Sequence, residues 1–309
     1  MQEYSIGVDL GGTNLRAAAV DRNGTMLNKV TGIVQRSGGR DVIIGHIVEA
    51  IEAIRQKFGS EGLRGVGIGI PGYIRMQTGV VVAAANLPGF DGSPIRDEIQ
   101  QLLGTPIIIE NDANAAALGE KWIGAGRDVN DLILITLGTG IGGGIISEGR
   151  VLRGSLGMAG ELGHMTIMPE GNPCGCGNSG CLEKHASATA IVGMARMLLL
   201  GDHLSAEDVY NLAVSGNEQA LQCFSSMGRA LGIALASLIN IFNFPLYLLS
   251  GGPLPSWDLF SPHMFEEVRR RSYTFTRTNT RIEKGTLGNE AGLFGAAYLP
   301  FLEEPGSHS

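Results

Sequence analysis

The sequence predicts a two-domain α/β protein in which one supersecondary unit occurs twice. Two glycine-rich turns, Gly11-Gly12-Thr13 and Gly138-Thr139-Gly140, each separate two short apolar segments of strand-like composition. Segments with helical spacing of apolar residues follow both units, as expected when helices cover a sheet. The chain has 309 residues, enough for two domains of about 150 residues each. We therefore expect a duplicated α/β fold.

The first half of the chain predicts three successive strands before any helix. Apolar segments bounded by turn residues delimit these strands. Apolar residues then recur at helical spacing and stop at Gly59, which favours a helix end. The expected strands are 4–10, 15–20, 25–34, 65–70 and 106–109, and the expected helices are 42–54, 94–103 and 113–122.

The second half predicts a similar strand pair followed mostly by helices. The expected strands are 132–137, 142–146 and 246–249, and the expected helices are 189–200, 206–214, 218–242 and 290–299. We expect a smaller first domain at 1–113 and a larger second domain at 114–289. The last segment, 290–309, is expected to pack back on the first domain.

Composition and charge argue against several classes of protein. The net charge of -7 disfavours a broad surface for nucleic acid or anionic membrane. The N-terminus lacks the basic and apolar regions of a signal peptide, and the longest apolar stretch, 230–242, is shorter than the roughly 18 residues that span a bilayer. A cytoplasmic protein without a nucleic-acid or membrane partner is expected.

The two glycine turns are candidate phosphate-binding loops. Glycines let backbone N–H groups approach phosphate oxygens, and the Thr hydroxyls add donors. Asp9, at the end of the preceding strand, is placed to face the magnesium ion of a nucleotide. Each turn alone is also compatible with a plain hairpin, but two such turns suit phosphoryl transfer, which depends on positioning and charge stabilisation.

A histidine and three cysteines form the most specific local pattern. His164, Cys174, Cys176 and Cys181 are interleaved with glycines that let the chain wrap a small centre. One imidazole and three thiolates are a usual tetrahedral zinc set, and four protein ligands leave no position for a reactive water. We expect a structural zinc; the alternative is an unrelated Cys-rich turn.

Carboxylates near this pattern and at a strand end are candidate substrate ligands. Glu161 and Glu183 flank the predicted zinc loop, whose folding is expected to bring them together to accept hydrogen bonds from sugar hydroxyls. The alternative is two solvated surface glutamates. Asp112 follows the apolar strand and Glu110-Asn111. It is a candidate general base, or else the N-cap of the helix that begins there.

Together these motifs resemble the ROK family of bacterial sugar kinases and repressors. The resemblance runs from Val8 to the 291–297 helix, nearly the whole chain. Asn14 stands where many members have Lys, with Arg16 two residues later, and Phe90 stands where glucokinase-like members often have Trp. The motifs that carry it are Asp9-Leu10-Gly11-Gly12-Thr13-Asn14, Glu110-Asn111-Asp112, Gly138-Thr139-Gly140-Ile141-Gly142-Gly143-Gly144, Glu161-Leu162-Gly163-His164 and Cys174-Gly175-Cys176-Gly177-Asn178-Ser179-Gly180-Cys181-Leu182-Glu183.

The resemblance implies an actin-like or ribonuclease-H-like duplicated fold with ATP and sugar in an interdomain cleft. It implies that Asp112 is the catalytic base. The implied sugar ligands are Gly72, Asn86, Asn111, Asp112, Glu161, His164 and Glu183. The implied ligands of ATP with Mg²⁺ are Asp9, Gly11, Gly12, Thr13, Asn14, Gly138, Thr139, Gly140, Gly251 and Gly252. Members are commonly dimers or tetramers, so a homo-oligomer is expected.

Three functions compatible with the resemblance are distinguished by substrate and partner. The leading expectation is a glucokinase that phosphorylates the 6-hydroxyl of glucose with ATP. The first alternative is an N-acetylmannosamine or N-acetylglucosamine kinase, because the same carboxylates suit any hexose. The second is a sugar-sensing repressor. It is disfavoured because only eight residues precede Asp9, which is too few for a DNA-reading module.

Overall fold

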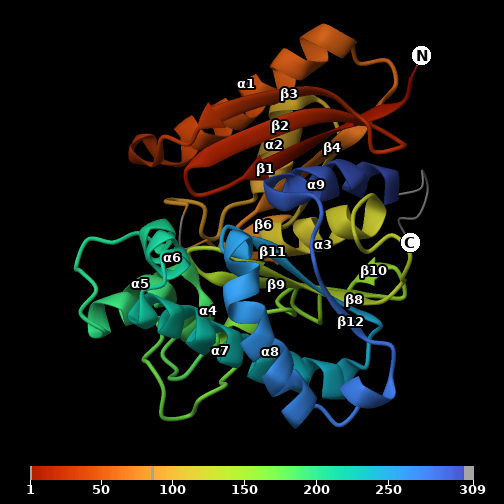
Figure 1. Ribbon diagram of the computed structural model, residues 1–309. Helices are drawn as coiled ribbons and strands as arrows, with labels where there is room; N and C mark the ends of the chain where they lie inside the picture. Colours follow the sequence, from red (N-terminus) through yellow and green to blue (C-terminus); the bar gives the residue numbers. More distant parts are fainter. Residues whose placement is uncertain (1, 85–86, 303–309) are drawn as a thin grey trace. The chain divides into compact units, whose positions relative to one another are not determined.

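The computed structural model describes residues 2–84 and 87–302 (Figure 1). The chain forms two compact units and passes between them four times. Unit 1 comprises 1–130, 144–160 and 286–309, and unit 2 comprises 131–143 and 161–285. The chain has two five-stranded sheets, each with its own helices, in agreement with the predicted duplicated α/β fold.

The sheet of unit 1 has the strand order β3-β2-β1-β4-β7. β1 (Tyr4–Leu10), β2 (Asn14–Asp21) and β3 (Met26–Ile33) are antiparallel, whereas β4 (Leu63–Ile70) and β7 (Ile107–Asn111) run parallel to β1. The register pairs Asp9 with Gly69 and Gly69 with Glu110. The carboxyl ends of the three parallel strands therefore bring Asp9 and Glu110 to the same edge of the sheet.

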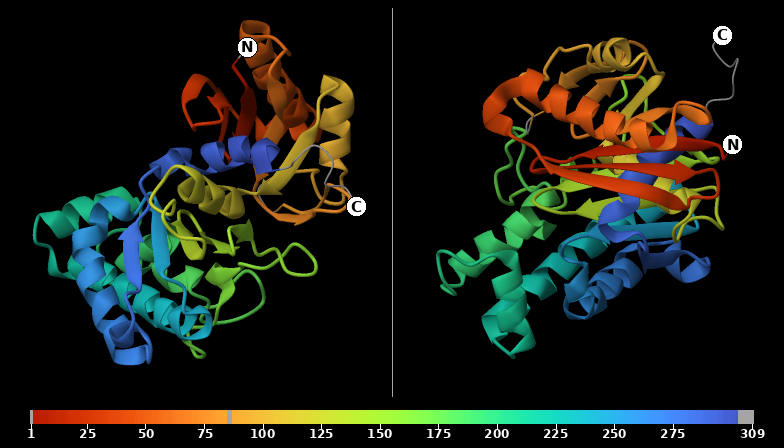
Figure 2. Two further views of the ribbon diagram at one scale, coloured as in Figure 1. Left: turned by 90° about the vertical axis from the view of Figure 1, so that its right-hand side faces the viewer. Right: turned by 90° about the horizontal axis from the view of Figure 1, so that it is seen from above.

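Helices cover both faces of this sheet (Figure 2). The apolar side chains of α1 (Gly39–Phe58) and α2 (Ile95–Leu103) pack on one face, with Ile6 and Val8 in the same core. α9 (Ala291–Leu302) packs on the other face. A Cβ at Gly67 would lie 1.9 Å from the carbonyl oxygen of Ala296, so β4 needs glycine where α9 lies against it. α3 (Asp112–Trp122) packs beside α9.

The second sheet has the order β10-β9-β8-β11-β12. β11 (Leu246–Gly251) runs parallel to β8 (Leu132–Leu137) and to β12 (Arg281–Lys284). β9 (Ile141–Ser147) follows β8 after the second glycine turn, and β10 (Arg150–Val151) forms a hairpin with β9. The order β9-β8-β11-β12 repeats the order β2-β1-β4-β7, which is the predicted duplication.

The helices of unit 2 are α4 (Glu183–Ala186), α5 (Ala188–Met197), α6 (Ala206–Val214), α7 (Glu218–Phe242) and α8 (Trp257–Arg271). α7 is long and apolar enough to cross a membrane, but most of its apolar window is buried in the protein, as in a core helix. α7 and α8 approach closely, since a Cβ at Gly228 would lie 2.1 Å from the carbonyl oxygen of Phe260.

Several elements are absent from the sequence prediction. α8 contains Pro262 and buries only a narrow apolar stripe, and proline normally indicates a helix end. β12 buries one side chain, Ile282. The small hairpin of β5 (Tyr73–Arg75) and β6 (Val80–Ala83) was also unpredicted. Short 3₁₀ helices are η1 (Arg36–Gly38), η2 (Leu162–His164), η3 (Leu254–Ser256), η4 (Phe275–Arg277) and η5 (Gly288–Glu290).

Candidate functional site

Asp9 lies near the end of β1, next to an arginine from β2. The Arg16 Nη1 atom lies 3.4 Å from Asp9 Oδ2 and donates to the carbonyl oxygen of Asn289 at 2.7 Å. Burial raises the pKa of Asp9 to about 6; Arg16 opposes the shift, and Asp112 and Glu290 add to it. Arg16 is thus engaged with Asp9, whereas Asn14 is exposed at the start of β2.

Asp112 begins α3 directly after β7. The N-cap of α3 is Asn111, whose Oδ1 accepts from the N–H groups of Ala113 at 3.0 Å and Asn114 at 3.2 Å. Asp112 is therefore not the capping residue, although its Oδ1 also accepts from the Ala113 N–H at 2.9 Å. Burial raises the pKa of Asp112, and this hydrogen bond opposes the shift. A carboxylate whose pKa moves toward neutrality suits a general base.

Asn111 links the start of α3 to the segment after β4. Its Nδ2 donates to the carbonyl oxygen of Gly72 at 3.1 Å. Gly72 has φ +131°, and a Cβ there would lie 2.2 Å from the carbonyl oxygen of Ala83. Two predicted sugar ligands, Gly72 and Asn111, are therefore in contact. Asn86 lies outside the described residues.

The first glycine turn closes with a backbone hydrogen bond from Gly11 N–H to the Asn14 carbonyl oxygen at 2.9 Å. The Val34 N–H donates to the Thr13 carbonyl oxygen, and Arg36 donates to the Gly12 carbonyl oxygen. With these carbonyls paired and Thr13 exposed, the turn has the fixed, open backbone that a phosphate loop requires.

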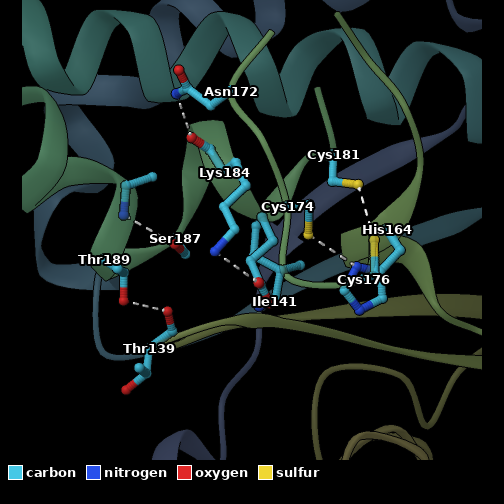
Figure 3. Close-up of polar contacts among 12 residues, drawn as sticks. Thr139, Ile141, His164, Asn172, Cys174, Cys176, Cys181, Lys184, Ser187 and Thr189 are labelled. Carbon is cyan, nitrogen blue, oxygen red and sulfur yellow. Dashed lines mark hydrogen bonds and ion pairs between the residues drawn. The ribbon is translucent and has the colours of Figure 1, made fainter. Parts of the chain in front are cut away.

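The second glycine turn is closed more tightly, by a backbone hydrogen bond from Gly138 N–H to the carbonyl oxygen of Gly140, two residues on, at 2.9 Å. The start of α5 holds it: the Ala188 N–H donates to the Gly138 carbonyl oxygen at 2.9 Å. The Thr189 hydroxyl donates to the Thr139 carbonyl oxygen at 2.7 Å (Figure 3). Each turn is thus closed by a backbone hydrogen bond from its first glycine, to the third residue after Gly11 and to the second residue after Gly138.

A cavity of about 540 Å³ adjoins this second turn within unit 2. Gly138 and Thr139 form one end, and Gly252 contributes from the segment after β11. Gly251 has φ +111°, and a Cβ there would lie 1.9 Å from the Leu137 carbonyl oxygen. The other lining residues are mainly apolar: Ala188, Ile191, Ala206, Glu207, Tyr210, Asn211, Phe224, Pro253, Pro255 and Ser256. The size and apolar wall suit a nucleoside.

The predicted zinc ligands come together in unit 2 (Figure 3). One ligand atom from each of His164, Cys174, Cys176 and Cys181 lies within 4.8 Å of the others. The Cys176 and Cys181 sulfurs are 3.7 Å apart, as are Cys174 Sγ and His164 Nδ1. Tetrahedral coordination with Zn–S bonds of about 2.3 Å places two sulfurs about 3.8 Å apart. The cluster is therefore compatible with zinc.

The two ring nitrogens of His164 face different residues. Nδ1 faces Cys174, and Nε2 lies 3.9 Å from Glu161 Oε2. The Asn178 side-chain N–H donates to Cys181 Sγ at 3.6 Å, which is the outer support typical of a metal thiolate. A bound metal would thus fix the ring that lies beside Glu161.

Glu183 begins α4, two residues after Cys181. Its Oε2 accepts from the Ile141 N–H, just after the second glycine turn, at 3.1 Å. Its Oε1 lies 3.7 Å from the Lys184 ammonium. Glu183 therefore links the cysteine loop to the glycine turn, so it is not a solvated surface glutamate, while Glu161 is 42% exposed.

Comparison with known proteins identifies the family. The model of the ROK family matches residues 5–301. The chain belongs to the ROK family. This ROK protein is 36% identical to a glucokinase of Halalkalibacterium halodurans, over 97% of this chain and 96% of the relative. It is 37% identical to a glucokinase of Thermotoga maritima, over 95% and 96%. It is also 31% identical to a xylose repressor of Caldicellulosiruptor bescii, covering 95% of this chain and 76% of the repressor.

Solved structures of ROK proteins have the same fold. A ROK hexokinase from Thermus thermophilus is 35% identical, with a TM-score of 0.87 over 97% of this chain and 98% of the hexokinase. A ROK family glucokinase from Streptomyces griseus, in complex with glucose and AMPPNP, is 33% identical, with a TM-score of 0.82 over 97% and 100%. The predicted actin-like ATPase fold is confirmed by these neighbours.

Some residues near the site were not identified from the sequence. Tyr210 and Phe224 line the cavity and pack edge to face, but in the sequence they are indistinguishable from core positions of amphipathic helices. Arg153 contacts Glu110 beside Asp112, although 43 residues separate the pair. Only the fold brings such positions together.

Proposed function

We propose that this ROK protein is an ATP-dependent hexokinase that transfers the γ-phosphate of ATP to the 6-hydroxyl of glucose. The observation that carries the proposal is Asp112, which lies partly buried with a raised pKa at the start of α3 while Asn111 caps the helix. Family membership and the glucokinase relatives support the same activity. The predicted function, an ATP-dependent sugar kinase, agrees with these findings.

In the proposed mechanism, Asp112 accepts the proton of the sugar 6-hydroxyl as that oxygen attacks the γ-phosphorus. The proposed sugar ligands in unit 1 are Gly72, Asn86 and Asn111. Those proposed in unit 2 are Glu161, His164 and Glu183, and the two carboxylates would accept from sugar hydroxyls. Binding the sugar in a fixed orientation places the attacking oxygen close to the phosphate and supplies much of the rate enhancement.

ATP is proposed to bind with its adenosine in the cavity of about 540 Å³ that Gly252 lines, with Gly251 as a further proposed ligand. The proposed phosphate ligands are Gly11, Gly12, Thr13, Asn14, Gly138, Thr139 and Gly140. Asp9 is the residue proposed to face Mg²⁺, which neutralises phosphate charge when bound with ATP. Zinc held by His164 and the three cysteines would be structural, because all four positions are filled by protein.

The decisive experiment is a coupled assay of ADP release across glucose, mannose, N-acetylmannosamine and N-acetylglucosamine. We expect the highest kcat/KM with glucose. Much faster phosphorylation of an N-acetylhexosamine would overturn glucose as the substrate. No sugar-dependent ADP release from any of them would overturn the kinase itself. Asp112→Asn protein reports the background of ATP hydrolysis without base catalysis.

Two alternatives have specific support. A putative N-acetylmannosamine kinase from Listeria monocytogenes is 26% identical, with a TM-score of 0.80, and the sugar panel tests this activity directly. The xylose repressors make sugar-dependent DNA binding the second alternative. A gel-shift assay at low salt with promoter DNA, with and without sugar, tests it; we expect no shift.

We also propose that the enzyme is cytoplasmic and a homo-oligomer, a dimer or a tetramer, and that its product feeds glycolysis. Light scattering of the purified protein measures the mass directly. A monomeric mass of 32.5 kDa would contradict the proposed assembly.

A further inference from the structure

Glu110 is a buried carboxylate that the proposed mechanism does not use. It is the last β7 residue before Asn111, and only 1% of it is exposed. Its Oε1 accepts from the Asn111 N–H at 3.0 Å and from the Asn114 side-chain N–H at 3.1 Å. Its Oε2 accepts from Arg153 Nε at 2.8 Å and Nη2 at 2.7 Å. Glu110 therefore contacts both ends of the turn that contains Asp112.

Arg153 is itself held by the segment that follows β10. The Ala159 N–H donates to the Arg153 carbonyl oxygen at 3.0 Å, which closes a loop around Gly157. A Cβ at Gly157 would lie 2.3 Å from the Ile74 carbonyl oxygen, so this loop lies tightly against β5. The guanidinium thus reaches Glu110 from a fixed backbone, entirely within unit 1.

Stability alone does not explain this ion pair. Taking the Glu110 carboxylate out of water is costly, whereas the Arg153 side chain is 36% exposed, so their attraction returns little net stability. A two-pronged guanidinium contact does, however, define a direction that apolar packing does not. The pair is suited to fixing the orientation of its neighbours.

We propose that Glu110 and Arg153 form a positioning pair that sets the β7–α3 turn, and with it Asn111 and Asp112, for sugar binding and proton transfer. This inference rests on the proposed function of Asp112. Glu110 acts through the backbone of Asn111 and the side chain of Asn114.

The test compares Glu110→Gln, Arg153→Met and Arg153→Lys with the unchanged enzyme. We expect kcat to fall about tenfold or more and KM for the sugar to rise several-fold in Glu110→Gln and Arg153→Met, because small misplacements near reacting groups are costly. KM for ATP should stay within twofold. Arg153→Lys should recover only part of the loss, because Lys keeps the charge but lacks the planar fork.

A matched control separates positioning from general loss of a buried ion pair. Glu267 on α8 is 6% exposed and accepts from Arg270 at 2.7 Å and Arg271 at 2.5 Å. Glu267→Gln should lower thermal stability without changing the KM for sugar. If Glu110→Gln and Arg153→Lys likewise lower only stability, with kcat and both KM values within twofold of wild type, the positioning role is refuted.

Hydrogen exchange gives a readout that does not depend on kinase activity. In Glu110→Gln and Arg153→Lys, the amides of 111–114 should exchange at least several-fold faster, because Glu110 accepts from the Asn111 N–H and orients the cap. Amides of α7 should be unchanged. Unchanged exchange at 111–114 would overturn the inference even in an active enzyme, whereas faster exchange in a protein without kinase activity would refute only the proposed function.

Discussion

Two aspartates of the candidate site, Asp9 near the end of β1 and Asp112 just after β7, have different surroundings. Asp9 is accompanied by Arg16 at 3.4 Å, whereas burial and hydrogen bonds from neutral groups alone set the pKa of Asp112. A carboxylate beside a cation suits a role as a fixed charge near a metal. A carboxylate without one accepts a proton more readily, because no cation stabilises its ionised form.

Asp112→Asn tests the role of the proposed base. Asparagine keeps the size and an oxygen that can accept from the Ala113 N–H, so the fold and sugar affinity should be nearly unchanged. We expect kcat to fall by roughly a hundredfold or more, the scale of lost general-base catalysis. Steady-state kinetics and calorimetric sugar titration measure the two quantities. Turnover near that of the wild type would remove Asp112 from the mechanism.

Because the pKa of Asp9 is raised in the fold, we expect ionisation of Asp9 to lower the free energy of unfolding as pH rises. Its pKa is 3.8 in the unfolded reference and about 6 in the fold. The fold therefore binds the proton more tightly, and the stability from Asp9 is full below pH 3.8 and is lost as pH rises through about 6. The shift of about two units corresponds to at most about 3 kcal/mol.

Asp9→Asn should therefore become more stable relative to wild type as pH rises from 4.5 to 7.5, by about 1–3 kcal/mol. Urea unfolding without nucleotide or Mg²⁺ measures this difference. Asp208→Asn is the control of opposite sign: hydrogen bonds from Ser205 lower the pKa of Asp208, so its stabilisation is lost as pH falls. If the difference in unfolding free energy between Asp9→Asn and wild type does not change with pH, burial does not raise the pKa of Asp9.

At the scale of secondary-structure elements, local signals were predictable and long-range ones were not. The cluster of His164 and three cysteines could be predicted because its members lie within 18 residues of one another, and their chemistry is that of a usual zinc ligand set. Strands β1, β4 and β8 were predicted because their apolar runs are buried on both faces. α8 was missed because Pro262 interrupts a pattern that only packing on α7 stabilises.

The cysteine loop gives the first prediction at this scale. Cys176→Ser, or a strong chelator, should lower both thermal stability and sugar affinity, because metal binding orders the loop next to Glu161 and Glu183. Metal analysis, thermal unfolding and sugar titration are the measurements. Cys223→Ala removes the fourth cysteine, which is buried in α7 outside the cluster, and should keep its zinc. Native protein without zinc would contradict the structural role.

The contact between α3 and α9 gives the second prediction at the scale of secondary-structure elements. A Cβ at Gly295 would lie 1.6 Å from the Ala115 carbonyl oxygen, so Gly295→Ala must push apart the helix that carries Asp112. We expect a loss of more than about 3 kcal/mol, because backbone cannot yield as a side chain does. Gly193→Ala, also in a helix but facing open space, should instead stabilise by about 1 kcal/mol. Equal effects in urea unfolding would refute the close packing.

For the whole molecule, the resemblance to the ROK family predicted the fold of nearly the whole chain, whereas local motifs alone predicted only separate loops and elements. The family prediction is confirmed by a match over 5–301, and the repeated strand order explains why a glycine turn follows the equivalent strands β1 and β8. The cavity wall could not be predicted, because Tyr210, Phe224 and Gly252 come from α6, α7 and the segment after β11. Nothing in the sequence indicates that these three residues line the same cavity.

Because residues from several separate elements line the cavity, nucleotide binding tests whether the fold brings these elements together. A ligand that binds only the native state at 100 times its Kd stabilises it by about 2.7 kcal/mol. AMPPNP with Mg²⁺ should therefore raise the Tm, and Tyr210→Ala should reduce the shift, because Tyr210 lines the cavity and packs on Phe224. Tyr273→Ala is the control, since Tyr273 is 71% exposed and does not line it. If both variants keep the full Tm shift, the nucleotide binds elsewhere, and the assignment of this cavity to adenosine is wrong.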